Sequence, residues 1–143
     1  MKIHVMGRQD SFTFCLNEPW IHIGVYTPGD SEVPLHSNLL RVGVLQLAFH
    51  DVGRVSDCDW LGCQIGAANV VRFNEVHAKK ILDFVKAHKV NHISVNCDAG
   101  ACRSPAIAAA LTKFWFDEDD LQYFKNHTPN YWVYRILGRV CND

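Results

Sequence analysis

Short runs of apolar residues, separated by polar and turn-forming residues, divide this chain into predicted strands and helices. Residues 2–6 and 20–25 are typical of short strands. Residues 42–49 form a mostly apolar run of strand length, as expected of a buried parallel strand. Residues 92–96 predict a further strand, which ends directly before Cys97.

The pattern changes to helical spacing in three places. Apolar residues within 73–88 recur at the spacing that places them on one face of a helix. Ser104 and Pro105 suit the N-cap and the first turn of a second helix, whose small residues would let it lie close to a sheet. A final helix is predicted over 131–140. This alternation of strands and helices predicts an α/β fold with a central, mainly parallel sheet flanked by helices.

Composition and charge narrow the class of protein. At 143 residues the chain fits a single domain, 1–143, and 48% hydrophobic residues suffice for a core. The net charge of −1 gives no basic surface for nucleic acid. No apolar run reaches the roughly 18 residues that span a bilayer, and the N-terminus lacks a signal peptide. We therefore expect a cytoplasmic protein that binds neither membrane nor nucleic acid, with its six cysteines as reduced thiols.

The segment from Cys97 to Ser104 carries the candidate chemistry. Its sequence is Cys97-Asp98-Ala99-Gly100-Ala101-Cys102-Arg103-Ser104. A tight loop between a strand and a helix can direct successive backbone N–H groups at one anion, and the helix N-terminus adds further donors. Gly100 permits a backbone conformation that other residues resist. We therefore predict a phosphate-binding loop in which residues 98–103 supply the donors.

Three side chains of this loop have candidate catalytic roles. The planar guanidinium of Arg103 can hold two phosphate oxygens at once, which a lysine cannot. The positive field of such a loop favours the thiolate of Cys97, the form that attacks phosphorus. The hydroxyl of Ser104 can donate a hydrogen bond to that sulfur when it leaves.

The segment resembles the C-x5-R-[ST] signature of the protein tyrosine phosphatase superfamily, particularly its small dual-specificity-like members. The resemblance covers roughly residues 41–140. It implies a protein tyrosine phosphatase-like fold and a cysteine-dependent phosphomonoester hydrolase that forms a cysteinyl-phosphate, with Cys97 as nucleophile. No metal or cofactor would be required, and the substrate would be a phosphorylated protein or a small phosphomonoester.

One departure from the family pattern opens alternatives. The resembling proteins normally carry histidine directly before the nucleophile, where this chain has Asn96. An amide forms hydrogen bonds but cannot become cationic, so the chain could instead be a non-catalytic phosphate-binding pseudophosphatase. A sulfurtransferase of the rhodanese type also uses a cysteine in an anion-binding loop, although it lacks the Arg-Ser-Pro that follows here.

A general acid is needed to protonate the leaving oxygen. Asp51 follows the 42–49 strand, in a Phe-His-Asp arrangement that resembles the family's F-x-D, and is the first candidate. Asp57 and Asp59 are the reserves, since they belong to the same long connection. An aspartate at a strand end is also a common turn residue.

The remaining cysteines leave two questions open. Cys58 and Cys63, with His50, could contribute to a zinc site, but no second pair completes one, which favours thiols or a loop brace. Cys102 could trap oxidised Cys97 as a disulfide, or could contribute only its backbone N–H. Neither the substrate nor the oligomeric state follows from the sequence.

Overall fold

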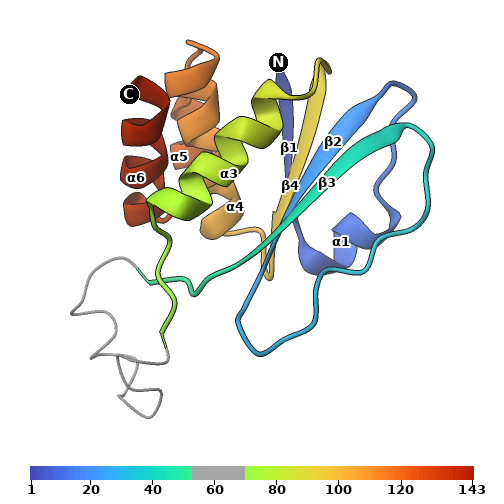
Figure 1. The fold of residues 1–143 in the computed structure, drawn as a ribbon, viewed down its shortest axis with the longest axis horizontal. Coiled ribbons are helices and arrows are strands. Elements are labelled where there is room, and N and C mark those ends of the chain that lie inside the picture. Colours follow the sequence, from blue (N-terminus) through green and yellow to red (C-terminus); the bar gives the residue numbers. More distant parts are fainter. Residues whose placement is uncertain (53–69) are drawn as a thin grey trace.

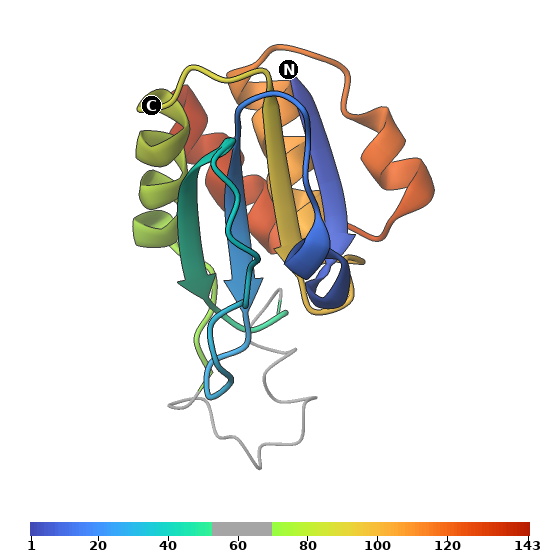
Figure 2. The same ribbon diagram turned by 90° about the vertical axis from the view of Figure 1, so that its right-hand side faces the viewer.

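A sheet of four parallel strands forms the centre of the protein. The structure is a computed structural model that describes residues 1–52 and 70–143. The strands lie in the order β1-β4-β2-β3. Their bounds are Lys2–Gly7 for β1, Trp20–Tyr26 for β2, Arg41–Ala48 for β3 and His92–Cys97 for β4. Because the described strands all run in one direction, their carboxyl ends meet at one edge of the sheet (Figure 2).

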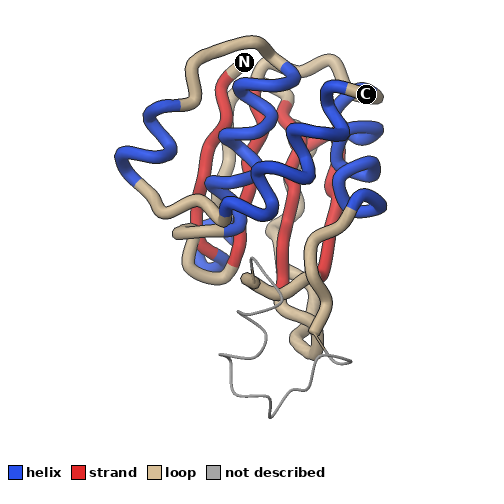
Figure 3. The backbone as a smooth tube through the Cα atoms, turned by 90° about the vertical axis from the view of Figure 1, so that its left-hand side faces the viewer, coloured by secondary structure: helices blue, strands red, loops and turns tan. Residues whose placement is uncertain are grey.

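Helices flank this sheet, so the predicted α/β class is confirmed. Helices α3, α4 and α6 cover one face, and α1 lies on the opposite side (Figures 1 and 3). Within residues 1–52 and 70–143, no helix is long and apolar enough to cross a membrane. The helical bounds are Arg8–Thr13 for α1, Glu75–Lys86 for α3, Arg103–Ala110 for α4, Leu111–Trp115 for the π-helix η2, Leu121–Asn126 for α5 and Tyr131–Asn142 for α6.

The two faces of β4 differ in polarity. Its side chains Ile93, Val95 and Cys97 join the hydrophobic core, against which the fully buried α4 packs. Six of the eight residues of α4 are alanine, serine or proline, which allow the helix to approach the sheet closely. The other face carries a buried polar row, made of His92, Ser94 and Asn96. The strand therefore delivers Cys97 to the helical side of the sheet and Asn96 to the opposite side.

The start of α4 differs from the sequence prediction. The helix begins at Arg103 and its N-cap position is Cys102, which makes no side-chain capping bond. Ser104 therefore lies inside the first turn and is not the cap. Its hydroxyl instead lies 3.2 Å from the Cys97 sulfur. Sequence rules for capping favoured serine, but the loop from β4 reaches the helix two residues earlier than they imply.

Candidate active site

Cys97 is the last residue of β4 and lies in the middle of the carboxyl edge of the sheet. Its thiol is free and buried. Two groups contact the sulfur: the Ser104 hydroxyl at 3.2 Å and the backbone N–H of Gly100, which donates to it at 3.2 Å. Both contacts would stabilise negative charge on sulfur, since each can place a donor hydrogen on it.

Gly100 shapes the turn of the loop. Its φ is +73°, in the left-handed region, and an added Cβ would lie 2.6 Å from the backbone carbon of Met6. The end of β1 is therefore the floor against which the loop packs. The N–H of Arg8, just beyond β1, also donates to the carbonyl of Asp98 at 3.1 Å. A tight loop of this shape needs glycine at this position.

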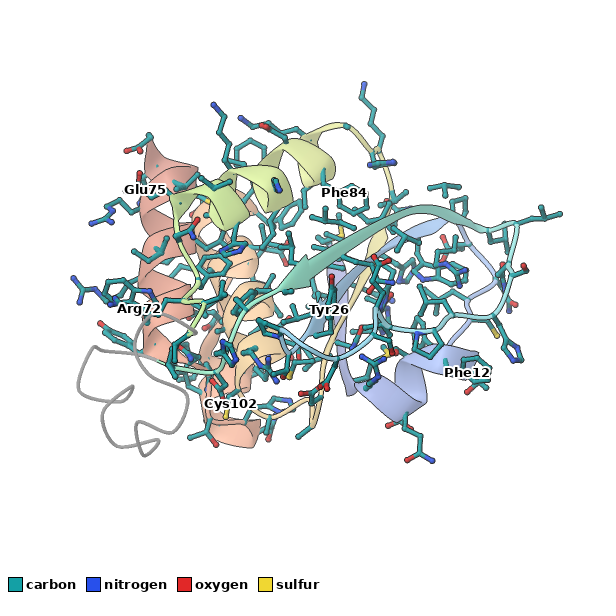
Figure 4. The ribbon with its side chains drawn as sticks, turned by 60° about the horizontal axis from the view of Figure 1, so that its bottom comes forward. Phe12, Tyr26, Arg72, Glu75, Phe84 and Cys102 are labelled. Atoms are coloured by element: carbon teal, nitrogen blue, oxygen red, sulfur yellow. The ribbon has the colours of Figure 1, made fainter. Side chains whose placement is uncertain are left out.

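The opposite side of the loop is held by the segment before α6. The N–H of Thr128 donates to the Ala101 carbonyl at 3.1 Å, and the N–H of Asn130 donates to the Cys102 carbonyl at 2.9 Å. Figure 4 marks this part of the molecule by Cys102. The backbone N–H groups of Ala99, Ala101 and Cys102 donate to no acceptor within the described residues. These donors are available to a bound anion.

Arg103 is buried, and its guanidinium is fixed by three acceptors. Nη1 donates to the Phe49 carbonyl at 2.8 Å and to the Thr27 hydroxyl at 3.1 Å. Nη2 donates to Oδ2 of Asp98 at 2.9 Å. The guanidinium therefore joins the ends of β2 and β3 to the loop that follows β4.

Asp98 is the acidic member of the loop, and its side chain is 42% exposed. Burial raises the pKa of Asp98, but hydrogen bonds from Thr27 and Arg103, with the positive charges of Arg103 and Arg8, outweigh it and lower the pKa. The Thr27 hydroxyl donates to Asp98 Oδ2 at 2.7 Å. Asp98 is therefore held as a carboxylate.

Asp51 lies beside the loop, whereas its two reserves cannot be placed. The Asn130 side chain donates to Asp51 Oδ1 at 2.7 Å. Burial, followed by the charge and hydrogen bond of Asp51, raises the pKa of the Cys102 thiol. The fold thus brings Asp51 to the same edge as Cys97. Asp57 and Asp59, like Cys58 and Cys63, lie outside the described residues.

Asn96 directly precedes Cys97, and a histidine from another strand is bonded to it. His22 of β2 is buried, with Nε2 2.7 Å from Asn96 Oδ1 and Nδ1 2.6 Å from Ser94 Oγ. Burial lowers the pKa of His22 to about 4, although the hydrogen bond with Asn96 opposes this. Asn96 Nδ2 in turn donates to the Cys97 carbonyl at 3.3 Å.

Three of these residues were not identified from the sequence. Thr27, His22 and Asn130 belong to segments far from residues 97–104 in the chain, and they show no motif. One signal was available for Asn130, since asparagine before an apolar helical run is a favourable N-cap, and it does cap α6. For a metal, the described ranges contain no group of three or more His, Cys, Asp or Glu residues that could hold one.

Comparison with known proteins extends the description of the fold. No family model and no curated protein sequence matches the chain. Among solved structures, it is similar to the crystal structure of PTPMT1 in complex with PI(5)P. The TM-score is 0.50 at 11% identity, over 88% of this chain and 78% of that chain. Identity this low speaks for the fold alone. The chain thus shares the protein tyrosine phosphatase-like fold of PTPMT1, a parallel sheet flanked by helices.

Proposed function

We propose that this protein is a cysteine-dependent phosphomonoester hydrolase of the protein tyrosine or dual-specificity type. One observation carries the proposal. A buried thiol with two potential donors on its sulfur lies in the same short loop as a buried, fully oriented arginine. The loop joins the central strand to the N-terminus of α4, where backbone donors and the helix dipole favour an anion.

The first step of the proposed reaction is phosphoryl transfer to sulfur. The Cys97 thiolate attacks phosphorus, so that an S–P bond forms while the P–O bond to the leaving group breaks. The Asp51 carboxyl donates its proton to the departing oxygen. Arg103 and the free amides of the loop hold the non-bridging oxygens, whose charge they stabilise in the transition state.

The second step is hydrolysis of the cysteinyl-phosphate. A water molecule attacks phosphorus and gives a proton to the Asp51 carboxylate, and the S–P bond breaks with its electron pair returning to sulfur. The Ser104 hydroxyl donates a hydrogen bond to the departing thiolate. Inorganic phosphate leaves, and Asp51 is protonated again for the next cycle.

The substrate class remains a phosphomonoester of a protein or of a small molecule. PTPMT1 was crystallised with PI(5)P, which makes a phosphoinositide one substrate to test. The side chains of the loop argue against a phosphoinositide, because Asp98, Ala99 and Ala101 include an acidic residue and no basic residue. A polyanionic headgroup would prefer basic residues there.

The experiment that tests the proposal is turnover of para-nitrophenyl phosphate, phosphopeptides and PI(5)P by the wild type and by Cys97→Ser. We expect phosphate release by the wild type and none by Cys97→Ser, which should still bind inorganic phosphate. Turnover by Cys97→Ser at the wild-type rate would refute the nucleophile. Trapping the wild type with acid and detecting phosphate on Cys97 by mass spectrometry tests the intermediate directly.

Asn96 supports a second candidate, a phosphate-binding protein without hydrolysis. The histidine that contacts Asn96 is kept neutral by burial, so neither residue places a cation beside Cys97. Binding of phosphopeptides with no phosphate release between pH 5 and pH 9 would favour that function. Thiosulfate is the control substrate, because its turnover would indicate a sulfurtransferase.

A further inference from the structure

Within the described residues, the hydrogen bonds of Arg103 use three of its guanidinium donors. A guanidinium has five N–H donors in a fixed plane. Two donors of Nη1 serve Phe49 and Thr27, and one donor of Nη2 serves Asp98. Nε and the second donor of Nη2 have no acceptor within the described residues. Arginine can hold an oxyanion through two parallel N–H bonds, and the two donors without an acceptor in the described part of the chain are the candidates for that contact.

Asp98 and Thr27 also bond to one another, which closes a triangle around the guanidinium. The Thr27 hydroxyl donates to the same carboxylate oxygen, Oδ2, that accepts from Arg103. The carbonyl of Asp98 is fixed to the end of β1 by the Arg8 N–H. The carboxylate is therefore held from the backbone and from the side chain. It is a fixed part of the loop and not a passing surface contact.

We propose that Asp98 is a positioning residue for the phosphate-binding arginine, with Thr27 as its support. This inference rests on the proposed function. The Asp98 carboxylate accepts from Nη2 of Arg103 and so fixes the plane of the guanidinium before substrate binds. Preorganised donors cost no reorganisation when charge develops in the transition state, and small displacements of such a group are costly.

The Asp98 carboxylate could also oppose phosphate binding through its negative charge, and a measurement can separate this effect from positioning. A carboxylate next to the phosphate site repels a dianion. If repulsion were the main effect of Asp98, removing its charge would tighten the binding of inorganic phosphate. If Asp98 positions Arg103, removing the Asp98 carboxylate weakens phosphate binding and lowers kcat, because Nη2 of the guanidinium is no longer held in place.

The test compares Asp98→Ala, Asp98→Asn and Thr27→Val with the wild type. For Asp98→Ala we expect kcat with para-nitrophenyl phosphate to fall about tenfold or more. Inorganic phosphate should bind several-fold more weakly in the Cys97→Ser background. Asp98→Asn keeps an acceptor for Arg103 and should therefore retain part of the kcat and part of the phosphate affinity. Thr27→Val should change both in the same direction as Asp98→Ala, by less. Asp30→Asn, an exposed acid of the loop after β2, is the control for net charge and should match the wild type.

A double-mutant cycle with Arg103→Lys shows whether Asp98 acts through the arginine. In the Cys97→Ser, Arg103→Lys background, adding Asp98→Ala should change phosphate affinity less than twofold, because the planar fork is already gone. An equal loss in both backgrounds, or tighter phosphate binding by Asp98→Ala, overturns the inference. Thermal unfolding of each variant identifies any that fail to fold, in which case Asp98→Asn decides.

Failure of the inference and failure of the proposed function give different results. If the wild type binds phosphate but hydrolyses none of the substrates, the proposed hydrolase is wrong, and the binding cycle still tests Asp98. If the wild type hydrolyses phosphomonoesters and Asp98→Ala has the wild-type kcat and phosphate affinity, the positioning role alone is wrong.

Discussion

His22 Nε2 lies 2.7 Å from Oδ1 of Asn96, the residue directly before the candidate nucleophile. Because Oδ1 only accepts, Nε2 carries a proton, and since burial lowers the pKa of His22 to about 4, Nδ1 is unprotonated at neutral pH and accepts from the Ser94 hydroxyl. The imidazole is therefore neutral, with both of its nitrogens bonded. The Asn96 amide extends the chain of bonds to the Cys97 carbonyl. Cys97 is thereby tied to the interior of the sheet through β2.

This arrangement predicts a pH dependence of stability. The pKa of His22 is about 4 in the folded protein, against 6.5 for the ordinary side chain. The unfolded chain therefore binds a proton on His22 between these pH values and the folded chain does not. The free energy of unfolding should fall as the pH decreases from about 6.5 to about 4, by about 3 kcal/mol from this group.

Urea unfolding of the wild type and His22→Gln at pH 8, 6 and 4.5 checks this prediction. Glutamine can bond to both neighbours but does not titrate, so the variant should lose less stability than the wild type on acidification. At pH 8 His22 is neutral in both states, and the offset measured there removes differences in packing. Equal pH dependence in the two proteins would contradict the buried neutral histidine.

A second prediction separates stability from activity along the same row of bonds. Asn96→Ala and Ser94→Ala each remove one partner of His22 in a buried site, so each should cost about 1–3 kcal/mol of stability. Only Asn96 also bonds to the Cys97 carbonyl. We therefore expect kcat for para-nitrophenyl phosphate to fall in Asn96→Ala and to change little in Ser94→Ala. A similar loss of kcat in both variants would mean that these hydrogen bonds affect activity only through the stability of the fold.

The parts of the site that the sequence predicts are those that depend on neighbours in the chain. A strand, a glycine and an arginine at fixed offsets from Cys97 are enough to predict a strand–loop–helix segment, and the structure contains it. The small residues after Pro105 likewise predicted close packing on the sheet, and all of α4 is buried. Local rules gave the segment because its geometry is made by consecutive residues.

The partners of that segment could not be predicted in the same way. Thr27 is 76 residues from Arg103, and Asn130 is 79 residues from Asp51. The strand order β1-β4-β2-β3 places Thr27, at the end of β2, beside the loop after β4, and Asn130 is held at the same edge by its backbone bond to the Cys102 carbonyl. Asp98 was identified as a loop residue, but whether its carboxylate turned to solvent or to Arg103 depended on Thr27. Tertiary contacts of this kind leave no periodic pattern in a sequence.

A third prediction concerns Asn130, whose side chain makes two separate bonds. Oδ1 accepts from the Val133 N–H and caps α6, while Nδ2 donates to Asp51. Asn130→Ala loses both bonds and should lower stability by about 1 kcal/mol through the lost cap. Asn130→Ser keeps an uncharged capping acceptor but is too short to donate to Asp51, so its stability should stay closer to that of the wild type.

Activity of the two Asn130 variants then shows whether Asp51 needs this donor. If Asp51 is the general acid, kcat for para-nitrophenyl phosphate should fall in both variants, including the one that keeps the cap. Asp51→Asn sets the lower limit for the loss of the acid. Should Asn130→Ser have the kcat of the wild type while Asp51→Asn is impaired, the acid would act without help from Asn130.

The last prediction concerns Gly100 in the loop after β4, for which Gly29 in the loop after β2, also at positive φ, is the matched control. Gly100 has a φ of +73°, and an added Cβ would meet backbone atoms of Met6 and Gly7 at 2.6 and 2.7 Å. Gly29 has a φ of +99°, and an added Cβ would meet nothing within 4 Å.

Gly29→Ala therefore introduces backbone strain alone, about 1–2 kcal/mol, and the variant should keep its phosphate binding and turnover. Gly100→Ala adds a collision with backbone that side-chain motion cannot relieve, so the loop must move away from β1. We expect a larger loss of thermal stability and loss of inorganic phosphate binding, measured by calorimetry. Equal behaviour of the two variants would mean that the packing of the loop on β1 does not determine its anion-binding shape.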